Sequence, residues 1–287
     1  MDMLAEARQA SRRFGAFTAV SAVDLVIGRG EVVGLLGANG AGKTTLIRLL
    51  LGLLRPSDGV VRLFGSAPSI ATRRRVGYVP QTLGLYAGLT VAENWAFTAA
   101  AYGNPGAGVP AGISGWSREL VGGLPLGAQR QVAFAVALSH RPELLILDEP
   151  TSGVGPLAGA RLWEGIRQAA GDGAGALVTT HNMEEAEQCD RLVVMADGKV
   201  VAAGLADEIT ASHPVAEVRC ADLNHAFAVL DADGIPVQPS GTALRAVGPA
   251  TAIADALARG GVDAAVSAVP ANLEEAFVAI VTGPVAS

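Results

Sequence analysis

Gly37-Ala38-Asn39-Gly40-Ala41-Gly42-Lys43-Thr44-Thr45 decides the fold, because it has the residues and spacing of a complete phosphate-binding loop. An apolar run over 31–36 precedes it and predicts a buried strand, and an apolar run over 46–51 follows it and predicts a helix. Its glycines let backbone N–H groups turn toward phosphate oxygens, and the start of the helix adds a partial positive charge. This setting disfavours a plain glycine-rich turn and predicts a nucleoside triphosphate site.

Lys43 stands out against the composition of the chain. There are 19 arginines but only two lysines, Lys43 and Lys199. A compact ammonium fits between phosphate groups where a planar guanidinium is not equivalent. We therefore expect Lys43 to reach the β and γ phosphates and the Thr44 hydroxyl to bind Mg²⁺. Lys199 lies in a polar turn and is expected to be structural.

A second segment, Leu144 to Pro150, combines an apolar strand with two acids at its end. Such a strand is expected to bring Asp148 to the Mg²⁺ of the phosphate loop. Glu149 would then face the γ-phosphate and polarise a water for in-line attack. The alternative is a buried strand that ends in an acidic turn, and the phosphate loop upstream disfavours it.

Two further polar residues, Gln81 and His181, also end predicted strands. The Gln81 side chain suits Mg²⁺ and an attacking water, and His181 could donate a hydrogen bond to a γ-phosphate. Either residue alone would more often be structural. Their position at strand ends, in this order along the chain, favours a functional role.

Composition limits the other possibilities. The length of 287 residues favours one large and one small domain. The net charge is −6 and Arg73-Arg74-Arg75 is the only basic cluster, so nucleic acid is not expected as a partner. Cys189 and Cys220 fit neither a metal site nor a disulfide framework, which indicates a reducing compartment. No signal peptide or membrane span is expected.

The predicted elements alternate between strands and helices, which favours an α/β fold with a mostly parallel sheet covered on both faces. A helix is expected from a capping box at Thr90 to about Ala101, and another from about Gln129. Between them, residues 103–123 are rich in Gly and Pro and predict loop or poorly packed structure. Near 205–214 the pattern changes to short strands and Ala-rich helices, which predict a small α/β domain.

The chain resembles the nucleotide-binding subunit of ATP-binding-cassette (ABC) transporters over roughly residues 8–205. The segments that carry the resemblance follow the order found in that family. They are Phe14-Gly15, Gly37–Thr45, Val79-Pro80-Gln81, Leu124–Gln131, Leu144–Pro150, Thr151–Pro156, Thr180-His181 and Asp190–Gly204. Asn272–Phe277 is similar to part of the small C-terminal domain of ABC-2 type drug and polysaccharide exporters.

The resemblance implies a phosphate-loop NTPase cassette with a mixed sheet over 1–208. It also implies a reduced helical subdomain at about 88–140 and a small C-terminal α/β domain over 209–287. ATP and Mg²⁺ are the implied cofactors. The implied catalytic residues are Glu149, His181, Gln81 and Lys43, and the implied metal ligands are Thr44, Gln81 and Asp148. Phe14 would stack on adenine, Gly37–Thr45 would hold the phosphates, and Gly127 would contact the ATP of a partner cassette.

The implied function is that of the ATP-hydrolysing subunit of an ABC-2 type exporter, peripheral on the cytoplasmic face of the cell membrane. Its partners would be separate ABC-2 type transmembrane permease subunits and a second cassette, in a homodimer or a heterodimer. The transported substrate would bind the membrane subunits. Two alternatives stay open: an ABC-like clamp that binds ATP with weak hydrolysis, and a soluble ABC ATPase not involved in transport.

Three departures from the family pattern bear on turnover. Pro125 stands where a serine hydroxyl usually contacts the partner's γ-phosphate, although a similar form occurs in some ABC-2 type exporters. Gly155 stands where an aspartate usually helps to couple the two sites. The stretch from Gln81 to Leu124 is also short for the family. These departures concern the efficiency of hydrolysis and leave the prediction of ATP binding unchanged.

Overall fold

The computed structural model describes residues 2–104 and 106–282, and their contacts divide the chain into two compact units. The first unit covers Met1–Val200 and the second covers Val201–Ser287. Each unit has a hydrophobic core of its own. Within the described residues no helix is both long enough and apolar enough to cross a bilayer.

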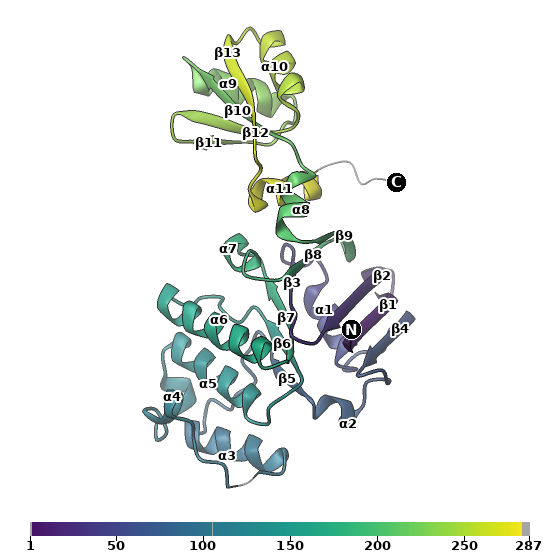
Figure 1. The fold of residues 1–287 in the computed structure, drawn as a ribbon, viewed down its shortest axis with the longest axis vertical. Coiled ribbons are helices and arrows are strands. Elements are labelled where there is room, and N and C mark those ends of the chain that lie inside the picture. Colours follow the sequence, from purple (N-terminus) through teal and green to yellow (C-terminus); the bar gives the residue numbers. More distant parts are fainter. Residues whose placement is uncertain (1, 105, 283–287) are drawn as a thin grey trace. The chain divides into compact units, whose positions relative to one another are not determined.

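A six-stranded sheet forms the centre of the first unit (Figure 1). Its order is β5 (Val76–Val79), β6 (Leu144–Asp148), β7 (Gly175–Thr180), β3 (Val32–Leu36), β8 (Arg191–Ala196) and β9 (Lys199–Gly204). The first five strands pair in parallel. Asp197 and Gly198 alone join β8 to β9, and both have positive φ, as a tight hairpin turn requires. The sheet is therefore mostly parallel, as the alternation of elements predicts, and mixed, as the family resemblance implies.

A second, antiparallel sheet in the first unit consists of β2 (Phe17–Gly28), β1 (Met3–Phe14) and β4 (Asp58–Leu63). The strand β1 is not apparent from its sequence pattern. Its register with β2 shifts at several places, so its side chains do not follow the strict alternation that identifies a strand. Only pairing with β2 and β4 makes this segment a strand.

Helices cover both faces of the central sheet. The helix α1 (Lys43–Leu50) packs with its buried leucines among residues of both sheets. Three other helices contact β3, β5 or β7: α5 (Leu126–Leu138), α6 (Pro156–Gly171) and α7 (Met183–Ala186). This cover explains why every residue of β3, β6 and β7 is buried. The carboxyl ends of these strands carry the predicted site residues.

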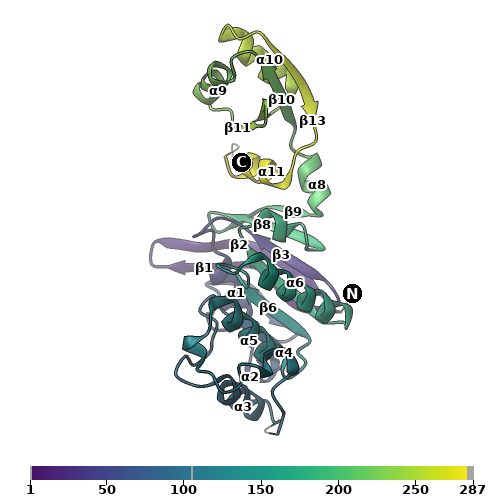
Figure 2. The same ribbon diagram turned by 90° about the vertical axis from the view of Figure 1, so that its left-hand side faces the viewer.

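The segment between β5 and β6 combines helices with turns and has a packed cluster of apolar residues. It contains α3 (Val91–Ala101), α4 (Ala111–Ser114), a 3₁₀ turn at Val121–Gly123, and α5. Both views place α3 and α4 beside α5, away from β1 and β2 (Figures 1 and 2). The capping box of Thr90 and Glu93 starts α3 as predicted, and α5 begins earlier than expected, at Leu126.

The prediction of loop over 103–123 agrees with most of the described residues of this stretch, but the alternative of poor packing is wrong. Ile113 and Val121 are buried in one cluster with Trp95 of α3 and Val132 of α5. The indole N–H of Trp95 also donates to the carbonyl of Ala107 at 2.8 Å. Widely separated apolar residues anchor this stretch, and such anchors leave no helical or strand period in the sequence.

The remaining short helices are α2 (Ile70–Arg73) and α8 (Ala206–Ala211). The second unit continues with β10 (Val215–Cys220), α9 (Leu223–Ala232), β11 (Val237–Ser240), β12 (Ala243–Val247), α10 (Ala250–Arg259), β13 (Ala264–Val269) and α11 (Leu273–Thr282). Its strands form an antiparallel sheet in the order β11-β12-β10-β13.

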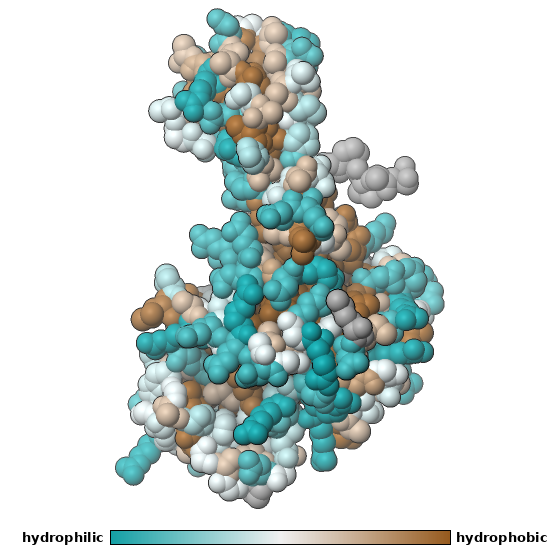
Figure 3. All heavy atoms as spheres, viewed as in Figure 1, coloured by the Kyte–Doolittle hydropathy of each residue, from teal (hydrophilic) through white to brown (hydrophobic). Residues whose placement is uncertain are grey.

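Hydrophobic residues gather on the visible surface over this sheet (Figure 3). Cys189 and Cys220 are both free thiols.

Candidate functional site

The phosphate loop lies between β3 and α1, as its sequence predicts. Gly40 and Gly42 have φ of 86° and 101°, a region that favours glycine. A Cβ on Gly42 would also lie 2.5 Å from the carbonyl oxygen of Ala19. The first turn of α1 contains no acidic residue, and no side chain caps it. Its free backbone N–H groups therefore suit an anionic ligand.

Lys43 points back into this loop. Its Nζ donates to the carbonyl oxygens of Gly37 at 2.6 Å and Ala38 at 3.1 Å. The residue is buried, and burial lowers the pKa of its ammonium, although the charges of Glu149 and Asp148 oppose that shift. A cation held in this way among carbonyl groups and carboxylates is ready to bind a phosphate.

Asp148 ends β6 beside the start of α1. Its two carboxylate oxygens accept hydrogen bonds from the hydroxyls of Thr44 at 3.0 Å and Thr179 at 2.8 Å. A carboxylate, a hydroxyl and a side-chain amide are the oxygen donors that suit Mg²⁺. Thr44 and Asp148 are in direct contact, and Gln81 lines the adjoining cavity, so the residues present fit this ion.

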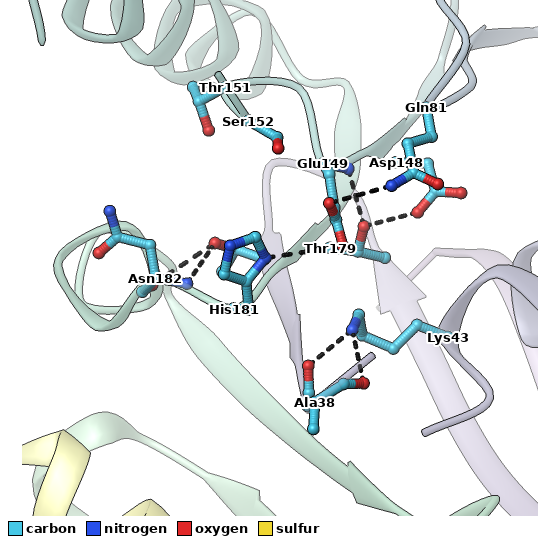
Figure 4. A network of polar contacts seen from close by, with 12 residues as sticks. Ala38, Lys43, Gln81, Asp148, Glu149, Thr151, Ser152, Thr179, His181 and Asn182 are labelled. Atoms are coloured by element: carbon cyan, nitrogen blue, oxygen red, sulfur yellow. Dashed lines mark hydrogen bonds and ion pairs between the residues drawn. The ribbon is translucent and has the colours of Figure 1, made fainter. Parts of the chain in front are cut away.

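Glu149 lies between Gln81 and His181 (Figure 4). The amide Nε2 of Gln81 donates to Glu149 Oε2 at 3.3 Å, and His181 Nδ1 lies 3.7 Å from Glu149 Oε1. Glu149 is buried and has φ of 51°, an uncommon value for a residue with a side chain. Its backbone N–H donates to the hydroxyl of Thr179 at 2.8 Å. Polar contacts thus hold both its backbone and its carboxylate.

Two cavities meet at Glu149. One, of about 440 Å³, is lined by the phosphate loop from Asn39 to Thr45 together with Gln81, Glu149 and Phe17. The other, of about 430 Å³, is lined by Glu149, by residues 151–156 and by His181. A carboxylate that borders both spaces can face a bound phosphate from one and a water from the other.

Most of the predicted site residues come together, but two do not line this site. Phe14 is half exposed, and the guanidinium of Arg12 lies over its ring at 4.7 Å; Phe17, its pairing partner in the β1–β2 hairpin, lines the phosphate-loop cavity instead. Gly127 lies at the start of α5, where an added Cβ would be 3.3 Å from Ala158 Cβ. Their roles stay predictions.

Thr179 is the functional residue that sequence reasoning missed. It is fully buried and bridges the carboxylate of Asp148 and the backbone of Glu149. The available signal was its place near the end of a strand, two residues before His181. A hydroxyl at such a strand end can hold acidic residues of the adjacent strand in place by hydrogen bonds.

The model of the ABC transporter family matches residues 20–152 of this chain. The chain is similar to the probable multidrug ABC transporter ATP-binding protein YbhF of Escherichia coli (strain K12). The two are 38% identical over 218 residues, which cover 72% of this chain and 38% of that protein. The chain thus spans well under half of that relative's length. The Nod factor export ATP-binding protein I of Burkholderia lata is 39% identical over 210 residues, covering 69% of each chain.

The fold is also similar to solved structures of ABC transporter cassettes. A structure described as the ATP-binding subunit of an ABC transporter has a TM-score of 0.65 and 31% identity, covering 73% of this chain and 92% of its own. The dimeric structure of MJ0796, a bacterial ABC transporter cassette, has a TM-score of 0.62 and covers 70% of this chain and 98% of its own. Its identity is 22%, and this likeness concerns the fold alone.

Proposed function

Because the chain belongs to the family of ABC transporter ATP-binding cassettes, we propose that it binds and hydrolyses ATP to drive export through separate membrane subunits. One observation carries this proposal. The phosphate loop, Gln81 and Glu149 line one cavity, Asp148 accepts a hydrogen bond from Thr44 of that loop, and Glu149 lies between Gln81 and His181. Such an arrangement has the groups needed to hold a triphosphate and to activate a water.

The proposed binding roles follow from the contacts. Lys43 and the N–H groups of Gly37–Thr45 bind the phosphates, with Lys43 exchanging its carbonyl partners for phosphate oxygens. Thr44, Gln81 and Asp148 hold Mg²⁺, which would neutralise charge on the phosphates. Phe14 stacks on adenine. Gly127 contacts the ATP that is bound to the phosphate loop of a partner cassette.

The proposed chemistry is general-base catalysis by Glu149. Its carboxylate accepts a proton from the attacking water, while the Gln81 amide and His181 orient the water and the γ-phosphate. Thr179 stabilises this arrangement because its hydroxyl binds the backbone N–H of Glu149. Lys43 completes the catalytic set by its charge beside the β and γ phosphates.

The partners and the location are also proposals. One relative is named as a probable multidrug ABC transporter ATP-binding protein and another as a Nod factor export ATP-binding protein, and these names support an exporter. We propose ABC-2 type permease subunits and a second cassette as partners, at the cytoplasmic face of the membrane. The functional division is proposed at 1–208 and 209–287, with a shortened helical subdomain at about 88–140.

A second candidate is an ATP-dependent clamp with weak hydrolysis. Two observations favour it: Pro125 and Gly155 both begin helices without a side-chain cap or a side chain that could reach a partner's phosphate. The intact group of Gln81, Glu149 and His181 favours hydrolysis over this alternative. Measured turnover separates the two.

The variant Glu149→Gln tests the function. The amide keeps the shape of the carboxylate but cannot accept a proton, so hydrolysis should fall by roughly a hundredfold or more, the scale of lost general-base catalysis. ATP binding should persist, and ATP should trap a closed dimer that size-exclusion chromatography detects. The control is Glu164→Gln, the same change at an exposed position of α6. Unchanged hydrolysis with no ATP-dependent dimer would contradict both the role of Glu149 and the paired cassettes.

A further inference from the structure

Arg130 of α5 is a buried cation that the proposed mechanism does not use. It is 5% exposed, and its Nη2 donates to the carbonyl oxygen of Ser152 at 3.1 Å. Its Nε and Nη1 are buried without a hydrogen-bond partner, and it forms no ion pair among the described residues. A buried, unpaired charge is costly. Its presence in a packed helix therefore calls for a functional explanation.

The acceptor of Arg130 belongs to a turn that begins at Glu149. The backbone N–H of Ser152 donates to the carbonyl of Glu149 at 3.3 Å, and Glu149 itself has a left-handed φ. Thr179 holds the front of this turn through the N–H of Glu149. Arg130 holds its far end through the carbonyl of Ser152. In Figure 4, Ser152 lies on the loop that leads away from Glu149.

The first turn of α5 packs on the same loop. An added Cβ on Gly153 would lie 2.9 Å from Leu126 Cδ2, and one on Gly127 would lie 3.6 Å from Val154 Cγ1. Burial lowers the pKa of the Arg130 guanidinium, and the charge of Glu149 partly opposes this shift. Arg130 is therefore both bonded to the turn and within electrostatic reach of the carboxylate at its start.

We propose that Arg130 is a positioning residue that fixes the turn from Glu149 to Ser152 and thereby holds the Glu149 carboxylate in its cavity. A left-handed backbone is unfavourable for glutamate and persists only where its surroundings hold it. Without the bond to Ser152 the turn can relax, and the carboxylate then leaves Gln81 and His181. This inference rests on the proposed ATP hydrolysis, and it adds that α5 controls the catalytic base of its own chain.

The test uses the full chain with Arg130→Met and Arg130→Lys, measuring kcat, KM, ATP affinity by calorimetry and the melting temperature. For Arg130→Met we expect kcat to fall roughly tenfold or more, as for a lost hydrogen bond to a charged group. ATP affinity should change by less than about twofold, because no binding residue is altered. The melting temperature should stay equal or rise, because an apolar side chain replaces an unpaired buried charge.

Arg130→Lys should recover most of kcat, because an ammonium keeps the charge and a donor for Ser152. The matched control is Arg161→Met, the same change at an exposed position of α6, which should leave kcat unchanged. If Arg130→Met does not fold, Arg130→Gln takes its place. Glutamine keeps one hydrogen-bond donor without the charge, so its kcat should lie between the kcat of Arg130→Lys and the kcat expected for Arg130→Met.

Two results would overturn the inference while the proposed function stands. One is a wild-type kcat in Arg130→Met while Glu149→Gln is inactive. The other is a parallel loss of kcat and melting temperature that lysine does not restore, because that indicates a structural role alone. If the full chain shows no hydrolysis that depends on Glu149, the proposed function fails first and this inference fails with it.

Discussion

Lys43 is the residue that the proposed function assigns to the β and γ phosphates, and its buried ammonium donates to two backbone carbonyls of the phosphate loop. We expect Lys43→Ala to weaken ATP–Mg²⁺ binding by roughly 1.5–3 kcal/mol, the range for hydrogen bonds to charged groups. Isothermal titration calorimetry measures this directly. The control is Lys199→Ala, since Lys199 is the chain's only other lysine and is exposed. Equal ATP affinity in the wild type and in Lys43→Ala would contradict the assignment of ATP binding to this loop.

Phe14 and Phe17 make a second comparison at the scale of single residues. Arg12 lies over the ring of Phe14, and stacking of adenine on this aromatic residue is worth about 1–3 kcal/mol by the scale for bases. We expect Phe14→Ala to weaken ATP binding by that amount. Phe17→Ala is the matched variant, because Phe17 pairs with Phe14 across the hairpin and lines the cavity. A larger loss for Phe17→Ala would assign the adenine platform to Phe17.

At the scale of elements, α5 and α6 both begin without a side-chain cap. Pro125 has φ and ψ of −57° and 147°, and Gly155 has −66° and 158°. Serine and aspartate adopt these extended values and are preferred N-cap residues. No atom lies within 4 Å of a Cβ built on Gly155. The backbone at both positions is therefore compatible with the residues that are usual in the family.

We expect the double variant Pro125→Ser with Gly155→Asp to raise the ATPase activity of the assembled complex. Serine would restore a hydroxyl that can donate to the partner's phosphate. If this hydrogen bond forms only in the transition state, it should raise the rate of hydrolysis by up to about a hundredfold. The caps should also stabilise both helices by a few tenths of a kcal/mol or more. Steady-state turnover and thermal unfolding of each single variant serve as controls. A folded double variant with no gain would mean that these positions are adapted to this chain's own geometry.

At the scale of the whole molecule, the chain consists of two units with separate cores, and the second has its own buried ion pair. Glu275 of α11 accepts hydrogen bonds from Arg245 on both carboxylate oxygens and from the backbone N–H of Asn272. Burial alone would raise the pKa of Glu275, but these hydrogen bonds hold it below its ordinary value of 4.5. Protonation of Glu275 in acid should therefore lower the free energy of unfolding of the second unit.

Because the folded pKa of Glu275 is depressed, its contribution to the free energy of unfolding is present above about pH 4.5 and is lost as the pH falls through the folded pKa. Glu275→Gln should be less stable than the wild type at neutral pH and should converge with it in acid. Circular dichroism measures both units. The fluorescence of tryptophan and tyrosine reports on the first unit alone, which contains all of these residues: Trp95, Trp116, Trp163, Tyr78, Tyr86 and Tyr102.

We therefore expect an acid transition in circular dichroism that fluorescence does not show and that Glu275→Gln shifts. The control is Asp233→Asn, which removes the exposed ion pair with Arg259 in the same unit and should have little effect. Identical acid transitions in the wild type and in Glu275→Gln would contradict the role of this ion pair.

The sequence by itself determined the family, the strand–loop–helix at Gly37–Thr45, and the buried strands that end at Asp148 and before His181. These features are local, since a short run of residues carries both the pattern and its physical reason. The order of the segments along the chain was enough to predict an α/β fold with a mostly parallel sheet, and parallel strands place their carboxyl ends at one edge.

Only the tertiary structure decided the features that depend on distant partners. Pairing with two other strands makes β1 a strand, and separate apolar anchors pack residues 103–123. Thr179 and Arg130 reach the turn at Glu149 from another strand and another helix. The contacts of Thr179 and Arg130 join residues more than twenty positions apart, and no local period records them. The sequence therefore predicted the chemical groups of the site, and the fold decided which residues hold them in place.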